Sequence, residues 1–307
     1  MIQPRRTFVK SMALLAGASS FSGSDFNFLA TDRKILSCNQ YAWFTFFNRE
    51  NRDWNADLDA SLLEYTSAGF KALEPSAGSV DEIIRLVPYL KKYHIAMPSL
   101  YVNSTLHSQE LAVASIASVL KIADEAKKYG TEIIVTNPNP LKWGGTENKS
   151  DGELQVQAQS LNNLGAQLRE RGMKLAYHTH DIELRAAARE FHHMLLATDP
   201  KNVSLCLDVH WVYRGSGNSQ IALFDIVKLY GKRIIELHIR QSVEGVWQES
   251  FGEGDIDYLR LAQELDALGV KPQLVLEQCL EKESPHQLTV VEAHKKDIQY
   301  AKRVFGI

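Results

Sequence analysis

The sequence predicts an α/β protein of the (β/α)8 barrel class, also called the TIM barrel. Eight short apolar runs, rich in β-branched residues, alternate with eight longer amphipathic segments. No Pro-, Gly- or Ser-rich linker interrupts residues 31–307, so these residues are expected to form one domain. The 307-residue chain is 45% hydrophobic and 23% charged, which is typical of a folded globular protein rather than a disordered or fibrous one.

The short apolar runs are the expected strands, and the amphipathic segments between them are the expected helices. The strands are predicted at residues 35–39, 70–74, 95–100, 132–136, 174–178, 203–208, 234–239 and 273–277. The helices are predicted at residues 58–66, 80–90, 111–129, 154–171, 190–198, 221–230, 258–268 and 289–305. The main rival fold is a doubly wound open sheet. That fold needs a Gly-rich phosphate loop after the first strand, and Cys38-Asn39-Gln40-Tyr41 follows here instead.

The first 30 residues read as an export signal rather than as part of the barrel. Arg5-Arg6-Thr7-Phe8-Val9-Lys10 precedes a short apolar stretch and then small residues. This basic hexapeptide resembles the bacterial twin-arginine signal. A periplasmic or otherwise exported location is therefore expected, with an ordinary basic tail as the alternative.

Composition excludes several kinds of partner. Lys and Arg total 34 and Asp and Glu total 37, and the resulting net charge of -3 argues against nucleic-acid binding. No apolar run reaches the roughly 18 residues of a membrane span. Three Cys residues give neither a disulfide framework nor a Cys-x-x-Cys zinc pair. A small-molecule partner is expected instead, and homo-oligomerisation is left open.

Each of the last four predicted strands ends in residues of metal-ligand or acid/base type. In a (β/α)8 barrel, polar residues at these carboxyl ends form the active site. Because side chains alternate along a strand, residues two apart share a face. Imidazole nitrogen and carboxylate oxygen together suit a divalent ion, with Mn²⁺ favoured and Zn²⁺, Co²⁺ or Fe²⁺ as alternatives. The residues at these strand ends are His178, His180, Asp208, His210, His238, Arg240 and Glu277.

The expected metal ligands take one residue from each of these strands. Strand five offers both His178 and His180, and His178 is favoured because it continues the strand directly; His180 would then face the substrate. The full predicted ligand set is His178, Asp208, His238 and Glu277.

A metal ion beside a carbonyl favours loss of a proton from the adjacent carbon. Glu277 is the first choice as base, and His180 or His210 is the second acid/base group, because imidazole titrates near neutral pH. Return of the proton to the same carbon is epimerisation, its return to the next carbon is isomerisation, and loss of a β-oxygen is elimination. The sequence leaves these three reactions open. Residues expected to contact the substrate are Arg240, Trp211 and Trp43.

The strand-end motifs resemble those of the xylose-isomerase-like TIM barrel superfamily of sugar phosphate isomerases and epimerases. The resemblance covers about residues 34–305, and the Gly252-Glu253-Gly254-Asp255-Ile256-Asp257 loop is its most specific mark. In ketose 3-epimerases of this superfamily, Glu, Asp, His and Glu hold the ion. The resemblance implies that Asp208, His238 and Glu277 match three of them, with His178 in place of the first Glu. It also implies that Glu183 contacts the substrate. The motif segments are 177–183, 207–212, 237–241, 251–257 and 275–278.

The resemblance implies a metal-dependent sugar isomerase or epimerase. Inosose dehydratase-like members also carry a His-rich strand five, so a keto-sugar or inosose dehydratase or lyase is the alternative. An endonuclease IV-like metal hydrolase is less favoured because it needs a basic DNA-binding face. A non-catalytic carbohydrate-binding barrel is also less favoured because the ligand-type residues are kept. Phosphorylated sugars are mainly cytoplasmic, so an exported enzyme is expected to act on free sugars, glycosides or their keto forms.

Overall fold

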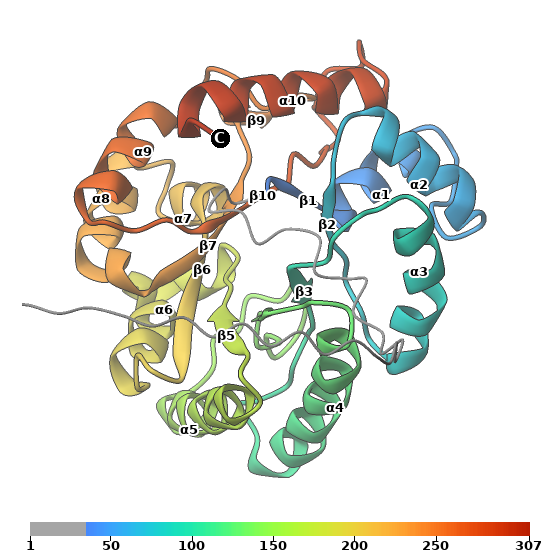
Figure 1. Cartoon of the computed structure of the whole chain (residues 1–307). Coiled ribbons are helices and arrows are strands. Elements are labelled where there is room, and N and C mark those ends of the chain that lie inside the picture. The colour runs from blue at the N-terminus through green and yellow to red at the C-terminus, as the bar shows by residue number, and fades with distance from the viewer. Residues whose placement is uncertain (1–34) are drawn as a thin grey trace, which may run out of the picture. The chain divides into compact units, whose positions relative to one another are not determined.

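Eight parallel strands form a nearly closed barrel inside a ring of helices, which confirms the predicted (β/α)8 class (Figure 1). The computed structural model describes residues 35–307. The predicted export signal, residues 1–30, lies outside the described residues, and the boundary at residue 31 stays a prediction. The barrel strands are β1 (Ser37–Asn39), β2 (Ala72–Glu74), β3 (Ser99–Tyr101), β4 (Ile133–Thr136), β5 (Lys174–Tyr177), β6 (Val203–Asp208), β7 (Ile234–Ile239) and β10 (Gln273–Leu276).

The strands follow one another around the barrel in the order β2-β1-β10-β7-β6-β5-β4-β3. The ring closes between β2 and β3 only through isolated bridges, Ala72 with Ala96 and Ser76 with Tyr101. Because all eight strands are parallel, their carboxyl ends open on the same side of the barrel. The weakly paired junction of β2 and β3, called the seam below, therefore extends to the side on which the carboxyl ends of the strands open.

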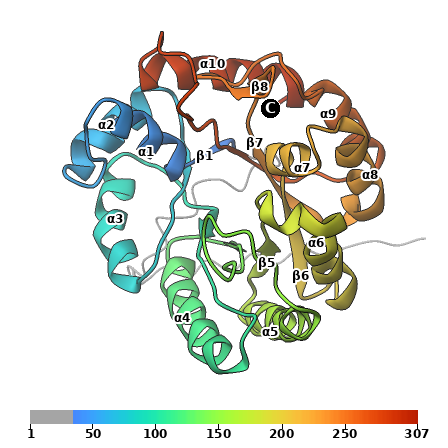
Figure 2. The same ribbon diagram turned by 180° about the vertical axis from the view of Figure 1, so that it is seen from behind.

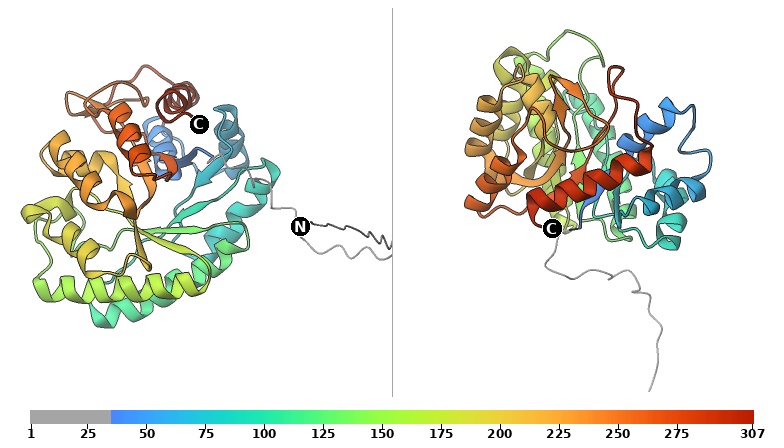
Figure 3. Two further views of the ribbon diagram at one scale, coloured as in Figure 1. Left: turned by 60° about the vertical axis from the view of Figure 1, so that its left-hand side comes forward. Right: turned by 90° about the horizontal axis from the view of Figure 1, so that it is seen from above.

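Helices pack around the outside of the barrel, as the view from behind and the side views show (Figures 2 and 3). In α3, Ser79 caps the helix by accepting from the Glu82 backbone N–H, and the apolar residues at helical spacing are the buried ones. Each of the eight predicted helices is present. They are α2 (Leu58–Ser67), α3 (Val80–Lys92), α4 (Gln109–Lys127), α5 (Asp151–Glu170), α6 (Arg185–Ala197), α8 (Gln220–Tyr230), α9 (Tyr258–Ala267) and α10 (Val290–Phe305).

Several short elements at the strand ends were not predicted. Two helices, α1 (Gln40–Arg49) and α7 (Val209–Gly215), begin directly after β1 and β6. The strand-end side chains of Asn39 and Asp208 act as their N-caps, accepting from the backbone N–H of Tyr41 and Trp211, each at 2.7 Å. The remaining short elements are the 3₁₀ helices η1 (Ile182–Leu184) and η2 (Gly231–Arg233) and the hairpin of β8 (Ser242–Val243) and β9 (Val246–Trp247).

Helix α1 places Trp43 in the hydrophobic core, where it does not contact the site. The Trp43 side chain is fully buried, and its ring centroid lies 5.6 Å from that of Trp54, 5.1 Å from Tyr65 and 4.8 Å from His294. This core placement is at odds with the expected substrate contact of Trp43, because the ring has no exposed surface. No helix within residues 35–307 combines the length and hydropathy that a membrane span requires.

Candidate metal centre

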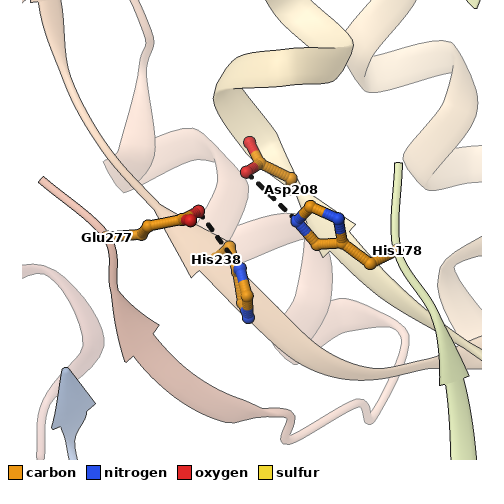
Figure 4. A group of neighbouring side chains, drawn as sticks. All are labelled: His178, Asp208, His238 and Glu277. Atoms are coloured by element: carbon orange, nitrogen blue, oxygen red, sulfur yellow. Dashed lines mark hydrogen bonds and ion pairs between the residues drawn. The ribbon is translucent and has the colours of Figure 1, made fainter. Parts of the chain in front are cut away.

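Four side chains from the carboxyl ends of β5, β6, β7 and β10 converge in the barrel (Figure 4). One ligand atom from each residue lies within 4.8 Å of the ligand atoms of the others, and all four residues are buried. They are the four residues that the sequence analysis proposed as metal ligands, namely His178, Asp208, His238 and Glu277.

Backbone pairing explains why these side chains point inward together. The ladder continues one residue past two of the strands, because His178 N donates to Thr136 O at 2.9 Å and Glu277 N donates to Ile239 O at 3.0 Å. Asp208 and His238 are partners in the register of β6 and β7. The strand geometry therefore fixes these side chains before any loop contributes.

The donor groups fit a divalent cation. His178 Nε2 lies 3.4 Å from Asp208 Oδ2, and His238 Nδ1 lies 3.2 Å from Glu277 Oε2. Within residues 35–307 neither ring nitrogen of the buried His178 makes a hydrogen bond, so either of them is free to carry the lone pair that binds a metal. Two imidazoles and two carboxylates form a donor set that first-row divalent metals accept.

Arg240 lies against this cluster with its side chain buried. Its Nη2 donates to Asp208 Oδ2 at 2.9 Å and to Glu277 Oε2 at 3.2 Å. Its guanidinium carbon lies 4.2 Å from the Trp247 ring centroid and 5.1 Å from that of Trp211. Burial opposes the charge of Asp208, but Arg240, His178 and His238 together outweigh it and lower the pKa of this carboxyl. Arg240 thus favours the ionised form of Asp208, and Trp211 contacts its guanidinium.

His180 lies outside the ligand cluster, at its edge. Asn137 Nδ2 donates to His178 O and to Glu183 Oε1, both at 3.0 Å, so Asn137 Oδ1 faces the Nδ1 of His180 at 3.1 Å. An amide oxygen only accepts, so Nδ1 carries the hydrogen and Nε2 carries the lone pair. Burial, together with the neighbouring His178, lowers the pKa of His180 to about 3. His180 therefore presents an acceptor nitrogen between Trp143 and Trp211.

Glu183 supports the loop after β5, and its position differs from the expected substrate contact. Its side chain is fully buried. Its Oε1 accepts from Asn137 Nδ2 at 3.0 Å, and its Oε2 accepts from His180 N at 2.7 Å. Burial and the neighbouring Glu190 raise its pKa to about 7. Both oxygens are occupied within the protein, so Glu183 positions the loop that carries His180.

His210 is also enclosed rather than exposed to the cluster. Trp247 Nε1 donates to His210 Nδ1 at 3.3 Å, so the hydrogen is on Nε2, which lies 2.9 Å from Ser242 Oγ. Ser242 Oγ in turn donates to Asp255 Oδ2 at 2.6 Å. Both ring nitrogens are occupied, which does not suit the acid/base role expected for His210. The chain of hydrogen bonds instead positions Trp247 against Arg240.

Two further carboxyl groups lie behind His238. Glu74 Oε1 is 3.0 Å from His238 Nε2, and Glu236 Oε1 is 3.4 Å from the same atom. Burial would raise the pKa of Glu74, but the His238 charge and the hydrogen bonds that Glu74 accepts lower this pKa to about 2. For Glu236, burial and the neighbouring Glu74 charge raise the pKa to about 8. The sequence analysis did not assign Glu236. Its signal was an acidic residue inside the apolar run 234–239.

Residues 63–303 match the family model described as xylose isomerase-like TIM barrel, and the chain belongs to this family. The match confirms the resemblance found in the strand-end motifs. The class of protein is therefore a xylose isomerase-like (β/α)8 barrel with a buried His/Asp/His/Glu candidate metal site.

Named relatives in other organisms include inosose dehydratases. The chain is 28% identical over 147 residues to the inosose dehydratase of Clostridium perfringens, and the alignment covers 42% of this chain and 48% of that relative. The chain thus spans about half the length of that relative. It is 25% identical over 273 residues to the inosose dehydratase of Mesomycoplasma hyopneumoniae, covering 81% of this chain and 89% of the relative.

Among solved structures, the fold is similar to D-psicose 3-epimerase from Clostridium cellulolyticum H10. The TM-score is 0.68, with 14% identity over 88% of this chain and 99% of that chain. At this identity the likeness concerns the fold alone.

Proposed function

We propose that the protein is a divalent-metal-dependent sugar isomerase or epimerase that removes a proton next to the carbonyl of a sugar or keto-sugar. The observation that carries this proposal is the buried cluster of His178, Asp208, His238 and Glu277 in a barrel of this family. The motifs of the sequence and the names of related proteins support a carbohydrate substrate.

The cluster would hold the ion, and Mn²⁺ is the metal we propose. Once bound, a divalent ion supplies the Lewis acidity that makes a hydrogen beside a carbonyl easier to remove. The protein supplies a dry, fixed set of donors, since Arg240 and the strand ladder hold the carboxylates in place.

Glu277 is the proposed proton acceptor. Its Oε2 faces His238 and Arg240, whereas its Oε1 makes no hydrogen bond within residues 35–307. Glu277 is 8% exposed, so its carboxylate can meet a substrate. His180 is the proposed second group, because its tautomer presents Nε2 rather than Nδ1 for proton exchange.

Dehydration of a keto-sugar or inosose is the alternative. It is favoured by the named inosose dehydratase relatives, one of which aligns along 81% of this chain. Its first half-reaction is the same proton abstraction, and it differs in the loss of a neighbouring oxygen.

Deuterium exchange tests the proposal and separates the two reactions. The Mn²⁺-loaded protein is incubated in D₂O with free ketoses, 3-keto-glycosides and an inosose, and the products are followed by NMR. Glu277→Gln should abolish exchange at the carbon beside the carbonyl, because an amide does not accept a proton at neutral pH. His180→Asn should keep exchange but slow product formation. Loss of exchange in both variants would contradict this division of roles, and absence of exchange in the wild type with every substrate would refute the function.

A further inference from the structure

A cavity of about 600 Å³ opens beside the metal centre, where β1, β2 and β3 end. It extends between α3 and α4, next to the seam at which β2 and β3 meet only through isolated bridges. Its volume lies within the range of roughly 300–1,000 Å³ that is typical of small-molecule sites. None of the four candidate metal ligands lines it.

The cavity is lined by polar groups that the protein leaves without partners. Gln40 is 5% exposed, and its Oε1 accepts from Ser76 N at 3.1 Å, but its Nε2 makes no hydrogen bond within residues 35–307. The Tyr101 hydroxyl, the Asn103 amide and the Ser118 hydroxyl are likewise without hydrogen bonds among the described residues. These groups keep free donors and acceptors that face the cavity, so a polar ligand in it could hydrogen-bond to them.

The charges and rings around the cavity define the chemical class of this ligand. The lining holds one basic residue, Arg85, and two acidic residues, Asp81 and Glu82, so it has no excess of positive charge for a phosphate or a carboxylate. Phe44 and Tyr101 supply aromatic surface beside the polar groups. Uncommitted amide and hydroxyl groups next to aromatic rings suit a neutral, polyhydroxylated ring.

Tyr101 lies between the cavity and the metal centre. It lines the cavity, and its ring centroid lies 5.3 Å from that of His178. We propose that the cavity is a second sugar subsite, so that the substrate is a neutral glycoside or disaccharide whose reacting unit lies at the metal centre and whose second unit lies in the cavity. This inference rests on the proposed function.

The test compares D-fructose with three ketose disaccharides that differ in linkage, namely lactulose, isomaltulose and turanose. Binding to the full-length protein is measured by calorimetry, and deuterium exchange is measured in parallel. At least one disaccharide should bind at least tenfold more tightly than D-fructose. Equal or weaker binding of all three would overturn the inference.

Variants on α4 and at the end of β3 test whether the tighter binding of a disaccharide depends on the cavity. Ser118→Trp narrows the cavity and should remove the tenfold advantage, whereas Ala117→Trp, on the neighbouring exposed residue that does not line it, should keep the advantage. Asn103→Ala should weaken disaccharide binding alone and adds no bulk. Retention of the advantage in both Ser118→Trp and Asn103→Ala would also overturn the inference. Tight binding of a disaccharide without deuterium exchange would refute the proposed function but support the second subsite. Deuterium exchange with D-fructose and no preference for a disaccharide would support the proposed function but refute the second subsite.

Discussion

The buried carboxyl of Glu183 should make the stability of the barrel fall as pH rises. Its pKa is raised from 4.5 to about 7, so the protonated form is the one that the fold favours. Its contribution is complete below the unfolded pKa of 4.5 and is lost as pH rises through the folded pKa of about 7. At about 1.4 kcal/mol per pKa unit, the full loss is about 3 kcal/mol, most of it between about pH 5 and pH 8.

Urea denaturation of the wild type and of Glu183→Gln at a series of pH values checks this expectation. Gln does not titrate, so the variant should lose about 2–3 kcal/mol less stability than the wild type between about pH 5 and pH 8. The difference between the two slopes is the measured quantity, because Gln also changes one of the two accepted hydrogen bonds. Identical slopes would refute the structural role of Glu183. A large change in KM with no change in slope would restore the substrate contact expected from the sequence.

Three other substitutions test the remaining assignments. Asp208→Asn should weaken Mn²⁺ binding by about 100-fold or more in a calorimetric titration while the thermal midpoint changes little, because an amide oxygen can still cap α7 at Trp211 N; unchanged affinity would remove Asp208 from the ligand set. Trp43→Leu should cost about 3 kcal/mol in urea denaturation and leave KM unchanged, since this side chain packs in the core; a raised KM without loss of stability would contradict that placement. His210→Gln should lower stability by about 1 kcal/mol without shifting the pH dependence of exchange, because its ring nitrogens are both hydrogen-bonded; a shifted pH profile would return His210 to an acid/base role.

The regular barrel elements could be predicted because their signals are local. Helix α3 buries residues at helical spacing, and β4 is a continuous apolar run covered on both faces. Helix α1 could not be predicted in the same way. Its sequence, Gln40-Tyr41-Ala42-Trp43-Phe44-Thr45-Phe46-Phe47-Asn48-Arg49, is aromatic-rich with only moderate intrinsic helix propensity, and it is stabilised by core packing.

The same reason explains which site residues were predicted well. Strand alternation placed His178 and Asp208 correctly because both belong to, or directly continue, a paired strand. His180 is two residues after His178, so a continued strand would place both side chains on the same face. The chain leaves the sheet after His178, however, and the contact with Asn137 sets the position of His180. Contacts between residues far apart in the sequence, such as that of Arg240 with Glu277, have no local signal.

Arg240 explains how two buried carboxylates can lie in one site. Removing Asp208 and Glu277 from water costs several kcal/mol unless an opposite charge is close, and Nη2 of Arg240 donates to both. The strand ends are therefore held together independently of an ion. Arg240 Nε is buried and makes no hydrogen bond in the described chain. His210 positions Trp247, and the Trp247 ring packs against the guanidinium of Arg240. His210 and Arg240, which were separate candidates in the sequence, therefore act together on the carboxylates that would bind the metal.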